Sequence, residues 1–507
     1  MPLNELRSEL DIIDDEIIKL FQKRMEIARK IGGYKKLQDL PIRDRERENS
    51  IIKRLEAEVN ENIKFAIEPL YEKVFQLSKE HQLEVFNNSS YHPEKYYGLI
   101  GAELEHSKSP YIHKLLGGYD YDLYPMDVFE FEDFLNRRQF SAMNVTIPYK
   151  VEAIKYIDEM SSLAKEIGSV NTIVNKKGKL FGYNTDYYGF KYMCEKAGIT
   201  LRDKKVLILG SGGSSRTVQT YVEDEKAKEI VIISRHGVND YSKLDEFKTF
   251  NVIINTTPVG MYPNNLECKI DLSIFDNCEA VIDIIYNPLK TKLILNAERR
   301  GIKTATGLDM LVSQAYYAAQ LFLGQDLPTE NIEKTIKRIK QDMLNIVFVG
   351  MPGCGKSTIG KMLADKLGRK FVDLDQYVED YTGASIPEIF KSKGESEFRY
   401  IESKLIQEVS KENGLVIATG GGTPIYQENS NAIAQNGYVI FLDRDINKLE
   451  TKGRPLSQDV ESLEILYKNR YNIYKSVANR EISVLEDMDK TLELVVEGLM
   501  EDEIISY

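Results

Sequence analysis

The spacing of apolar residues changes twice along the chain. Up to about residue 86, apolar residues recur every three or four positions without strand-like alternation, which predicts helices only. Over 96–342, and again over 344–507, short apolar runs alternate with amphipathic stretches, a pattern typical of α/β domains. We therefore expect an all-α three-helix domain over 1–86, followed by two α/β domains over 96–342 and 344–507.

The two joints between these domains differ in composition. Residues 87–93, with the sequence NNSSYHP, are polar and rich in turn-forming residues, whereas residues 341–344 join a charged helix almost directly to an apolar strand over 345–349. We expect the first joint to flex more than the second.

A glycine-rich loop follows the strand over 345–349 and precedes an amphipathic helix over 358–367. Its sequence, GMPGCGKS over 350–357, has the spacing of a phosphate-binding P-loop. Backbone N–H groups of such a loop surround phosphate oxygens, the lysine reaches the terminal phosphates and the serine hydroxyl binds Mg²⁺. The predicted nucleotide-binding residues are Gly350, Gly353, Gly355, Lys356, Ser357 and Thr358.

Further motifs after the P-loop indicate the acceptor of the phosphoryl group. In order they are FVDLD at 371–375, GE at 394–395, FR at 398–399 with Glu402, GGG at 420–422, RPL at 454–456, and finally Arg470 and Tyr474. These residues resemble shikimate kinase over 345 to about 497. The resemblance implies ATP as the donor and shikimate as the acceptor.

The same resemblance implies a role for each matched side chain. Asp375 would activate the acceptor hydroxyl, Asp373 would support the Mg²⁺ shell, and Arg454 would stabilise the transferring phosphoryl group. An anionic acceptor needs arginine forks, and the implied shikimate-binding residues are Arg399, Gly420, Gly421, Gly422 and Arg470. The stretch 443–453 is short and lacks the arginine that stacks on adenine in that family, so the adenine contact stays unassigned.

The middle block contains a second glycine-rich turn. VLILGSGG at 206–213 is a strand that enters a dinucleotide-binding turn, with Ser215 where a third glycine or alanine is usual. The next strand, over 230–233, ends in Ser234-Arg235-His236 where an acid would read the ribose of NAD. A cation at that place favours the 2′-phosphate of NADP, although an arginine exposed at a strand end is the alternative.

Motifs across the whole middle block resemble shikimate dehydrogenase over 96 to about 342. They are HSKSP at 106–110, NVTIPYK at 144–150, VNT at 170–172, NTD at 184–186, NTTPVGM at 255–261, YNP at 286–288, and GLDM at 307–310 with Gln314. The resemblance implies a substrate part over about 96–200 and 306–342, and a Rossmann-like NADP-binding part over about 201–305. It implies substrate contacts from Ser107, Ser109, Asn144, Thr146, Asn171, Tyr286 and Gln314, and cofactor contacts from Gly210, Ser211, Gly212, Gly213, Ser234, Arg235, Gly307 and Met310.

Lys150 and Asp186 form the catalytic pair that this resemblance implies. Reduction of a ketone by hydride needs a proton donor at the developing alkoxide and an acid that sets the charge of the donor. Tyr187 stands where the family has glycine, and we expect it to narrow the crevice without removing the acid. Quinate oxidation with NAD is the alternative activity for this block.

The first helical stretch carries a cation on its apolar face. Apolar residues from Leu3 to Ile31 alternate by three and four positions, and this seam demands an apolar residue at position 24, where Arg24 stands. A guanidinium on such a seam costs several kcal/mol unless an anion meets it. On the second helix, Arg47 and Glu48 share the apolar face of Ile51 and Leu55, so we expect the helices to enclose a charged pocket.

This stretch resembles the all-helical chorismate mutase family over 1 to about 84, with PIRDRERE at 41–48 as its central motif. The implied site residues are Arg7, Arg24, Lys35, Asp44, Arg47 and Glu48, in an interlocked homodimer in which Arg7 reaches the site of the other subunit. The family's glutamine position is occupied by Phe86, and Gln82 would have to replace it. A non-catalytic dimerisation or regulatory module is the alternative.

The composition of the chain limits the kinds of molecule that it is expected to bind. The 507 residues carry a net charge of -12, which disfavours nucleic acid, and the four cysteines are too far apart for a zinc site or a disulfide framework. Neither an apolar run of membrane-spanning length nor a secretory signal is visible, so we expect a cytoplasmic enzyme with small-molecule substrates. The three resemblances together imply a multifunctional enzyme of aromatic amino-acid biosynthesis that uses NADP(H), ATP and Mg²⁺.

Overall fold

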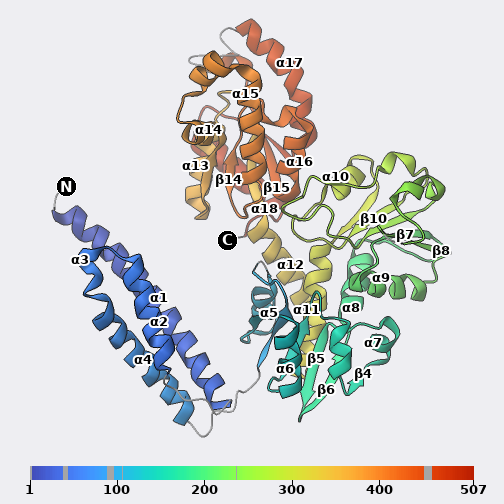
Figure 1. Ribbon diagram of the computed structural model, residues 1–507. Helices are drawn as coiled ribbons and strands as arrows, with labels where there is room; N and C mark the ends of the chain where they lie inside the picture. The colour runs from blue at the N-terminus through green and yellow to red at the C-terminus, as the bar shows by residue number, and fades with distance from the viewer. Residues whose placement is uncertain are drawn as a thin grey trace. The chain divides into compact units, whose positions relative to one another are not determined.

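The computed structural model describes residues 3–37, 44–87, 96–105, 107–235, 237–449 and 460–506 (Figure 1). Contacts along the chain divide it into two units, Met1–Tyr96 and Tyr97–Tyr507. The second unit therefore contains both α/β blocks. Most of the polar linker expected over 87–93 lies outside the described residues.

The first unit is helical, as its periodicity predicts. Its described elements are α1 (Leu3–Leu37), α2 (Arg45–Glu58), the one-turn α3 (Glu61–Lys64) and α4 (Ile67–Asn87). α1 packs along α4 and buries Met25 and Ala28 against Phe75. The earlier half of the apolar seam is not covered by this packing, because Leu10, Ile13, Ile17 and Leu20 are between 50% and 68% exposed.

The second unit begins with a mixed sheet in the order β2-β1-β3-β5-β6-β4. Its strands are β1 (Tyr97–Gly101), β2 (Asp122–Pro125), β3 (Ala142–Val145), β4 (Glu159–Met160), β5 (Thr172–Lys176) and β6 (Lys179–Tyr183). The helices of this part are α5 (Ser109–Gly117), α6 (Val128–Arg137), η1 (Glu152–Tyr156), α7 (Ser162–Ile167) and α8 (Asp186–Lys196), with α11 (Gly307–Leu323) returning from later in the chain. α11 packs against α5 and α8, so its residues close the site from a distant part of the sequence.

A parallel sheet follows in the order β11-β10-β9-β7-β8. Its strands are β7 (Lys205–Leu209), β8 (Glu229–Ile233), β9 (Val252–Asn255), β10 (Ala280–Asp283) and β11 (Lys303–Thr306). The accompanying helices are α9 (Gly213–Asp224), η2 (Tyr241–Phe247), η3 (Leu272–Ile274) and α10 (Lys292–Arg299). Apolar clusters on the two faces of this sheet, one with Val206 and Ile208 and the other with Leu207 and Leu209, show why β7 is apolar throughout.

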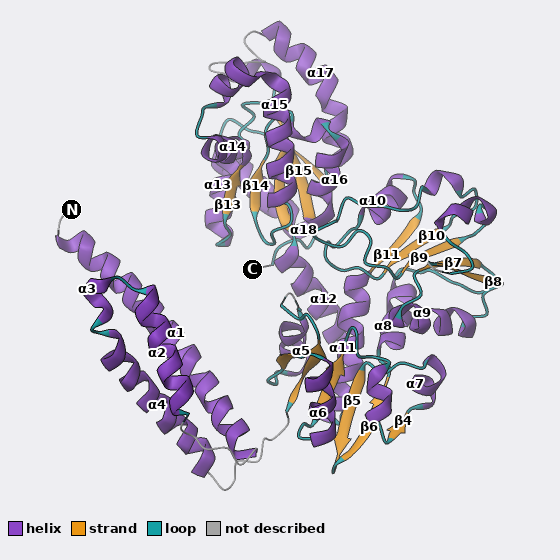
Figure 2. Cartoon of the chain, viewed as in Figure 1, coloured by secondary structure: helices purple, strands orange, loops and turns teal. Residues whose placement is uncertain are grey.

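The last sheet is also parallel, in the order β13-β14-β12-β15-β16, and helices pack around its strands (Figure 2). The strands are β12 (Asn345–Val349), β13 (Phe371–Asp373), β14 (Val416–Ala418), β15 (Gly437–Asp443) and β16 (Arg480–Ser483). The helices are α13 (Lys356–Leu367), α14 (Leu374–Thr382), α15 (Ile386–Val409), η4 (Thr423–Ile425), α16 (Gln427–Asn436), η5 (Ile446–Lys448), α17 (Val460–Val477) and α18 (Met488–Glu501).

The two α/β blocks share one apolar core although their sheets are separate. A single residue, Leu344, lies between the end of α12 (Glu330–Met343) and the start of β12. The short joint predicted at 341–344 therefore contains no separate linker segment. One cluster of buried side chains includes Leu289 and Val312 of the first block together with Phe348 and Phe441 of the second. This continuous core explains why the contacts place both blocks in a single unit.

Candidate active sites

A cavity of about 490 Å³ lies over the P-loop. Gly350, Gly353 and Gly355 have φ values of 146°, 82° and 106°, backbone conformations that residues with a Cβ rarely adopt. Lys356 is buried and its Nζ donates to the carbonyls of Gly350 (3.1 Å) and Met351 (3.0 Å). The predicted residues that line this cavity are Gly353, Gly355, Lys356, Ser357, Thr358, Asp375, Arg399, Gly420, Gly421, Gly422 and Arg470.

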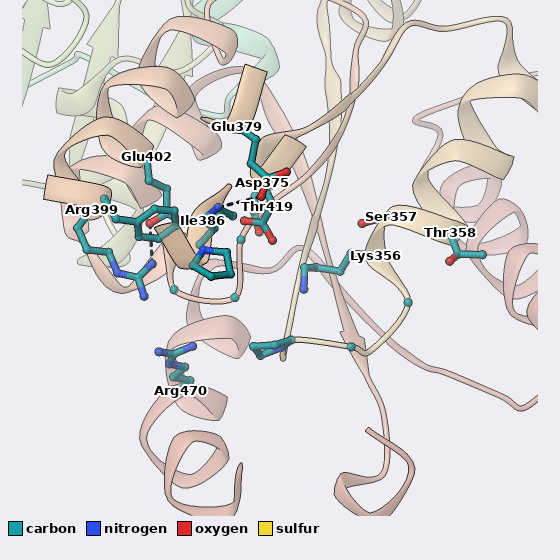
Figure 3. Close-up of a pocket in the computed structure, with 18 of the residues that line it drawn as sticks. Lys356, Ser357, Thr358, Asp375, Glu379, Ile386, Arg399, Glu402, Thr419 and Arg470 are labelled. Atoms are coloured by element: carbon teal, nitrogen blue, oxygen red, sulfur yellow. Dashed lines mark hydrogen bonds and ion pairs between the residues drawn. The ribbon is translucent and has the colours of Figure 1, made fainter. Parts of the chain in front are cut away.

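The arginine side of the cavity is rigid because its charges are paired. Arg399 donates to Glu402 at 2.7 Å and contacts Glu395 at 3.3 Å, while Glu402 also accepts from the Thr423 hydroxyl. Burial works against the charge of Arg399, but the two glutamates outweigh it and raise the pKa of the guanidinium. Figure 3 shows Arg399 and Arg470 on one side of the cavity and Lys356 on the other, with Asp375 between them.

The triple glycine leaves no room for side chains. A Cβ on Gly420 would lie 2.4 Å from Glu402 Oε1, one on Gly421 would lie 2.7 Å from the Pro352 ring, and one on Gly422 would lie 2.4 Å from Arg399 Nη1. Close approach of this backbone to the charged pair is therefore the physical reason for the motif.

Asp373 and Asp375 have different positions. Asp373 caps α14 and accepts from the backbone N–H groups of Asp375 (3.0 Å) and Gln376 (3.4 Å), whereas Asp375 lines the cavity. The lining residues that sequence reasoning missed include Arg444 and Met488. Arg444 follows β15 and its Nη1 lies 3.5 Å from the Gly353 carbonyl; its place directly after an apolar strand was the available signal. Arg454 lies outside the described residues.

A second cavity, of about 990 Å³, lies in the middle block. Lys150 Nζ and Asp186 Oδ2 meet on its wall at 2.6 Å, and both side chains are largely buried, at 15% and 9% exposure. Asp186 is the first residue of α8, where the N–H groups of a helix start stabilise a carboxylate. The predicted residues Ser107, Ser109, Asn144, Thr146, Asn171, Tyr286, Gly307, Met310 and Gln314 also line this cavity.

Buried amides hold the substrate side of this cavity. Asn171 Oδ1 accepts from the Thr185 N–H at 2.7 Å, immediately before Asp186. Asn144 Nδ2 donates to the Asn171 carbonyl at 3.2 Å and to Thr172 Oγ1 at 3.0 Å. The strands β3 and β5 and the start of α8 are thus tied together by side chains that were each predicted as substrate contacts.

The predicted cofactor turn joins β7 to α9. Gly210 has a φ of 107°, and Ser215 is buried and donates to the Gly210 carbonyl at 2.7 Å. A serine in place of the third glycine is therefore accommodated by an internal hydrogen bond. Arg235 is exposed after the end of β8, the strand beside β7. Ser214, which sequence reasoning did not select, lines the cavity. The predicted cofactor residues Gly210, Ser211, Gly212 and Gly213 are not among the lining residues.

Tyr187 does not narrow this cavity as predicted. Its hydroxyl donates to Asp224 at 2.6 Å, and its ring packs edge-on against Tyr221 with centroids 5.4 Å apart. Both partners belong to α9, so the side chain is directed away from the cavity wall that Asp186 occupies. The larger side chain at this position bridges α8 and α9 instead.

Asp283 is a further buried group beneath the same cavity. Its carboxylate accepts from Asn255 Nδ2 (3.1 Å), the Ile285 N–H (3.1 Å) and the Thr291 hydroxyl (2.7 Å). Burial raises the pKa of Asp283 to about 7, although the three hydrogen bonds work in the opposite direction. Sequence reasoning passed over this residue, and its position three residues before Tyr286 was the only signal.

In the helical unit, Arg24 contacts neutral groups within the described residues. Its guanidinium donates to the Ser78 hydroxyl and lies 5.6 Å from the centre of the Phe75 ring. Burial lowers its pKa. Glu48 pairs with Lys79 at 2.9 Å, which ties α2 to α4.

The remaining predicted residues of this unit differ in burial and in their contacts. Asp44 caps α2 by accepting from the Arg47 N–H at 3.0 Å, and the side chains of Arg7 and Arg47 are exposed. Lys35 is half-buried. Gln82 is buried where α4 crosses Gly32 of α1, and its Oε1 has no hydrogen-bond partner among the described residues. The side chain of Phe86 lies outside the described residues.

The fold and the cavities define a multifunctional enzyme that joins a nucleotide-dependent oxidoreductase to a P-loop phosphotransferase. Three family models match the chain in order: chorismate mutase type II at residues 6–83, the shikimate dehydrogenase substrate binding domain at 99–173, and shikimate kinase at 352–500. These matches agree with the resemblances in the sequence, and they make the chain an enzyme of the shikimate pathway.

Similar proteins support the same assignment. A shikimate dehydrogenase (NADP(+)) from Clostridium perfringens strain 13 is 38% identical over 271 residues, which cover 98% of that protein and 48% of this chain. One from Clostridium beijerinckii is 37% identical over 247 residues, which cover 92% of that protein and 45% of this chain. The chain therefore belongs to the shikimate dehydrogenase family.

Solved structures of related proteins cover the same part of the chain. A chorismate mutase/shikimate 5-dehydrogenase fusion protein from Clostridium acetobutylicum is 34% identical, with a TM-score of 0.47, over 49% of this chain and 97% of that one. Shikimate dehydrogenase 1 from Peptoclostridium difficile is 32% identical, with a TM-score of 0.46, over 48% and 97%. Among the described helices, none has the length and apolar character needed to cross a membrane.

Proposed function

We propose that the chain catalyses three reactions: reduction of 3-dehydroshikimate to shikimate with NADPH, phosphorylation of shikimate to shikimate 3-phosphate with ATP, and rearrangement of chorismate to prephenate. The observation that carries the first is the 2.6 Å contact of Lys150 with Asp186 on the wall of a large cavity. The proposed domain boundaries are those of the sequence: 1–86, 96–342 with its NADP-binding part at about 201–305, and 344–507.

In the dehydrogenase, Lys150 delivers a proton to the carbonyl oxygen as hydride arrives at the carbon. Asp186 holds the ammonium group in place at the cavity wall. Ser107, Ser109 and Asn171 bind the hydroxyl and carboxylate groups of the substrate, together with Asn144, Thr146, Tyr286 and Gln314.

NADP(H) fits the parallel sheet of this block. The Gly210 turn presents backbone to the pyrophosphate at the start of α9, and exposed Arg235 after β8 matches a 2′-phosphate. Ser211, Gly212, Gly213 and Ser234 complete the contacts with the phosphates and ribose, while Gly307 and Met310 border the nicotinamide. The bound cofactor supplies the hydride.

In the kinase, Asp375 accepts the proton of the shikimate hydroxyl that attacks the terminal phosphate. Arg399, Arg470 and the backbone of Gly420 to Gly422 hold the shikimate carboxylate and hydroxyls. Lys356, with Arg454 from the segment outside the described residues, neutralises the transferring phosphoryl group. Arg444 beside Gly353 is a further contact for the nucleotide, and it compensates for the adenine contact that the sequence left unassigned.

Mg²⁺ fits the same place. Ser357 follows Lys356 at the start of α13, and the Asp373 carboxylate stands at the next strand end, where it already caps α14. Because Mg²⁺ keeps several waters and takes few protein ligands, one hydroxyl and one carboxylate reached through water are sufficient.

The proposed mutase reaction requires no nucleophile, and cationic side chains would carry it. Arg24, Lys35 and Arg47, together with Arg7 of a partner subunit, fix a dicarboxylate in a compact conformer and stabilise its breaking ether bond, with Glu48, Asp44 and Gln82 completing the site. The unpartnered Oε1 of Gln82 supports a polar ligand at that point. The second candidate is a non-catalytic dimerisation or regulatory module, in which Arg24 joins α1 to α4 through Ser78.

A homodimer through the N-terminal helices is supported by the apolar side chains on α1. Leu10, Ile13, Ile17 and Leu20 stand at three- and four-residue spacing and are all at least half exposed. An apolar stripe of this length is covered by another helix in a stable assembly. The proposed location is the cytoplasm.

One incubation tests the coupled reactions. Purified full-length chain receives 3-dehydroshikimate, NADPH and magnesium-ATP, and products are identified by mass spectrometry. Lys150→Ala should abolish shikimate formation and leave added shikimate phosphorylated, whereas Lys356→Ala should do the reverse. Loss of both steps in either folded variant contradicts the assignment of separate sites. Prephenate formation from chorismate by intact protein decides between the mutase and the non-catalytic module.

A further inference from the structure

α16 is a polar helix that is buried except at its first turn. Its last two residues, Gln435 and Asn436, are 1% and 0% exposed. Buried amide side chains cost free energy unless they are hydrogen-bonded, so their partners indicate what the helix holds in place. Asn436 Nδ2 donates to Asn413 Oδ1 within the kinase half at 3.5 Å. The other partners of these two side chains lie in the dehydrogenase half, where α10 runs beside α16 (Figure 1).

Two backbone N–H groups of the dehydrogenase half donate hydrogen bonds to the last turn of α16. Asn436 Oδ1 accepts from the Leu289 N–H at 2.7 Å, and the Gln435 carbonyl accepts from the Lys290 N–H at 3.0 Å. Leu289 and Lys290 directly follow Tyr286-Asn287-Pro288, the segment that brings Tyr286 to the cavity wall. The substrate loop is therefore anchored three residues away by the kinase half.

A second dehydrogenase loop is held by the side chain of Gln435. Gln435 Nε2 donates to the Asn265 carbonyl at 2.8 Å, and the Asn265 amide donates back to Gln435 Oε1. This loop also contains Met261, which lines the cavity, and the Tyr262 N–H donates to the Asn287 carbonyl at 3.3 Å. The two loops are thus bonded to each other and both rest on α16.

We propose that Gln435 and Asn436 of the kinase half are positioning residues for the dehydrogenase, because they hold the two loops that place Tyr286 and Met261 at its cavity. This inference rests on the proposed role of Tyr286 in substrate binding. If only a fraction of the molecules keeps the two loops in the binding-competent arrangement, the apparent affinity for substrate is reduced in proportion to that fraction. The expected effect is on the KM for shikimate more than on kcat.

The test measures shikimate oxidation with NADP⁺ in the full chain. Asn436→Ala leaves the buried Leu289 N–H without an acceptor and should raise the KM for shikimate about tenfold, with less than about a twofold change in kcat. Asn436→Asp keeps the acceptor for the Leu289 N–H and should restore a KM near that of the wild type. Asn265→Ala removes the donor to Gln435 Oε1 from the dehydrogenase side, without altering the kinase half, and should also raise the KM.

The matched control is Asn431→Ala. Asn431 Oδ1 accepts from Arg299 Nη2 at 2.6 Å, so this variant also breaks a hydrogen bond between the two halves, but at the far end of α10 from the substrate loop. The inference is overturned if Asn431→Ala raises the KM as much as Asn436→Ala does. It is also overturned if the aspartate variant fails as the alanine variant does, or if folded Asn265→Ala and Asn436→Ala both keep the wild-type KM. A wild-type chain that does not oxidise shikimate would refute the proposed function instead.

Discussion

Gly422 offers a sharp test of the shikimate side of the kinase. In Gly422→Ala the new Cβ would lie 2.4 Å from Arg399 Nη1 and 2.6 Å from its Cζ, whereas ordinary contacts begin at 3.4 Å. The guanidinium must therefore move by about 1 Å, away from the position in which it holds Glu402 at 2.7 Å. A displacement of this size at a substrate-positioning group costs about 100-fold in rate.

A coupled assay for ADP release measures this effect at varied shikimate and varied ATP. We expect kcat/KM for shikimate to fall about 100-fold in Gly422→Ala, while the KM for ATP changes less than about twofold, because the P-loop contacts are made by other residues. The dehydrogenase activity of the same preparation is the internal control for folding. An unchanged kcat/KM for shikimate would show that Arg399 does not hold this substrate.

Three further predictions concern other parts of the chain. The pKa of Asp283 in the folded protein is about 7, above its ordinary value of 3.8, so the folded protein binds this proton more tightly than the unfolded chain does. The free energy of unfolding therefore falls by up to about 4 kcal/mol as pH rises between those two values. Asp283→Asn should flatten the pH dependence of urea unfolding, and an unchanged pH dependence contradicts this reasoning. Arg235→Asp should lower the preference for NADPH over NADH by about tenfold or more in steady-state assays, and an unaltered ratio would show that Arg235 does not contact the 2′-phosphate. Ile17, which is 55% exposed, should support the dimer, so Ile17→Asp should give monomers in light scattering, unless the wild type is itself monomeric.

Local sequence signals predicted the three fold types and many of the residues that line the cavities. The P-loop at 350–357 and the turn at 206–213 could be predicted because glycine spacing reports backbone conformations that only a few residues permit. Lys150 and Asp186 were matched as motif residues from separate segments, and the structure brings their charged atoms together. Arg24 was noticed because it interrupts an apolar repeat, and the structure shows that its guanidinium donates to Ser78.

What tertiary structure alone decided is the pairing of residues far apart in the chain. The sequence of α16 is that of a polar surface helix, and nothing within it predicts that Asn436 accepts a hydrogen bond from Leu289, 147 residues earlier. The direction of Tyr187 toward α9 and the burial of Asp283 among Asn255 and Thr291 likewise depend on neighbours that local periodicity does not report. The periodicity of apolar residues indicates which face of a helix or strand is buried, because it distinguishes only positions that face solvent from positions that face the core. Which element covers that face is determined by packing and hydrogen bonding across the whole fold.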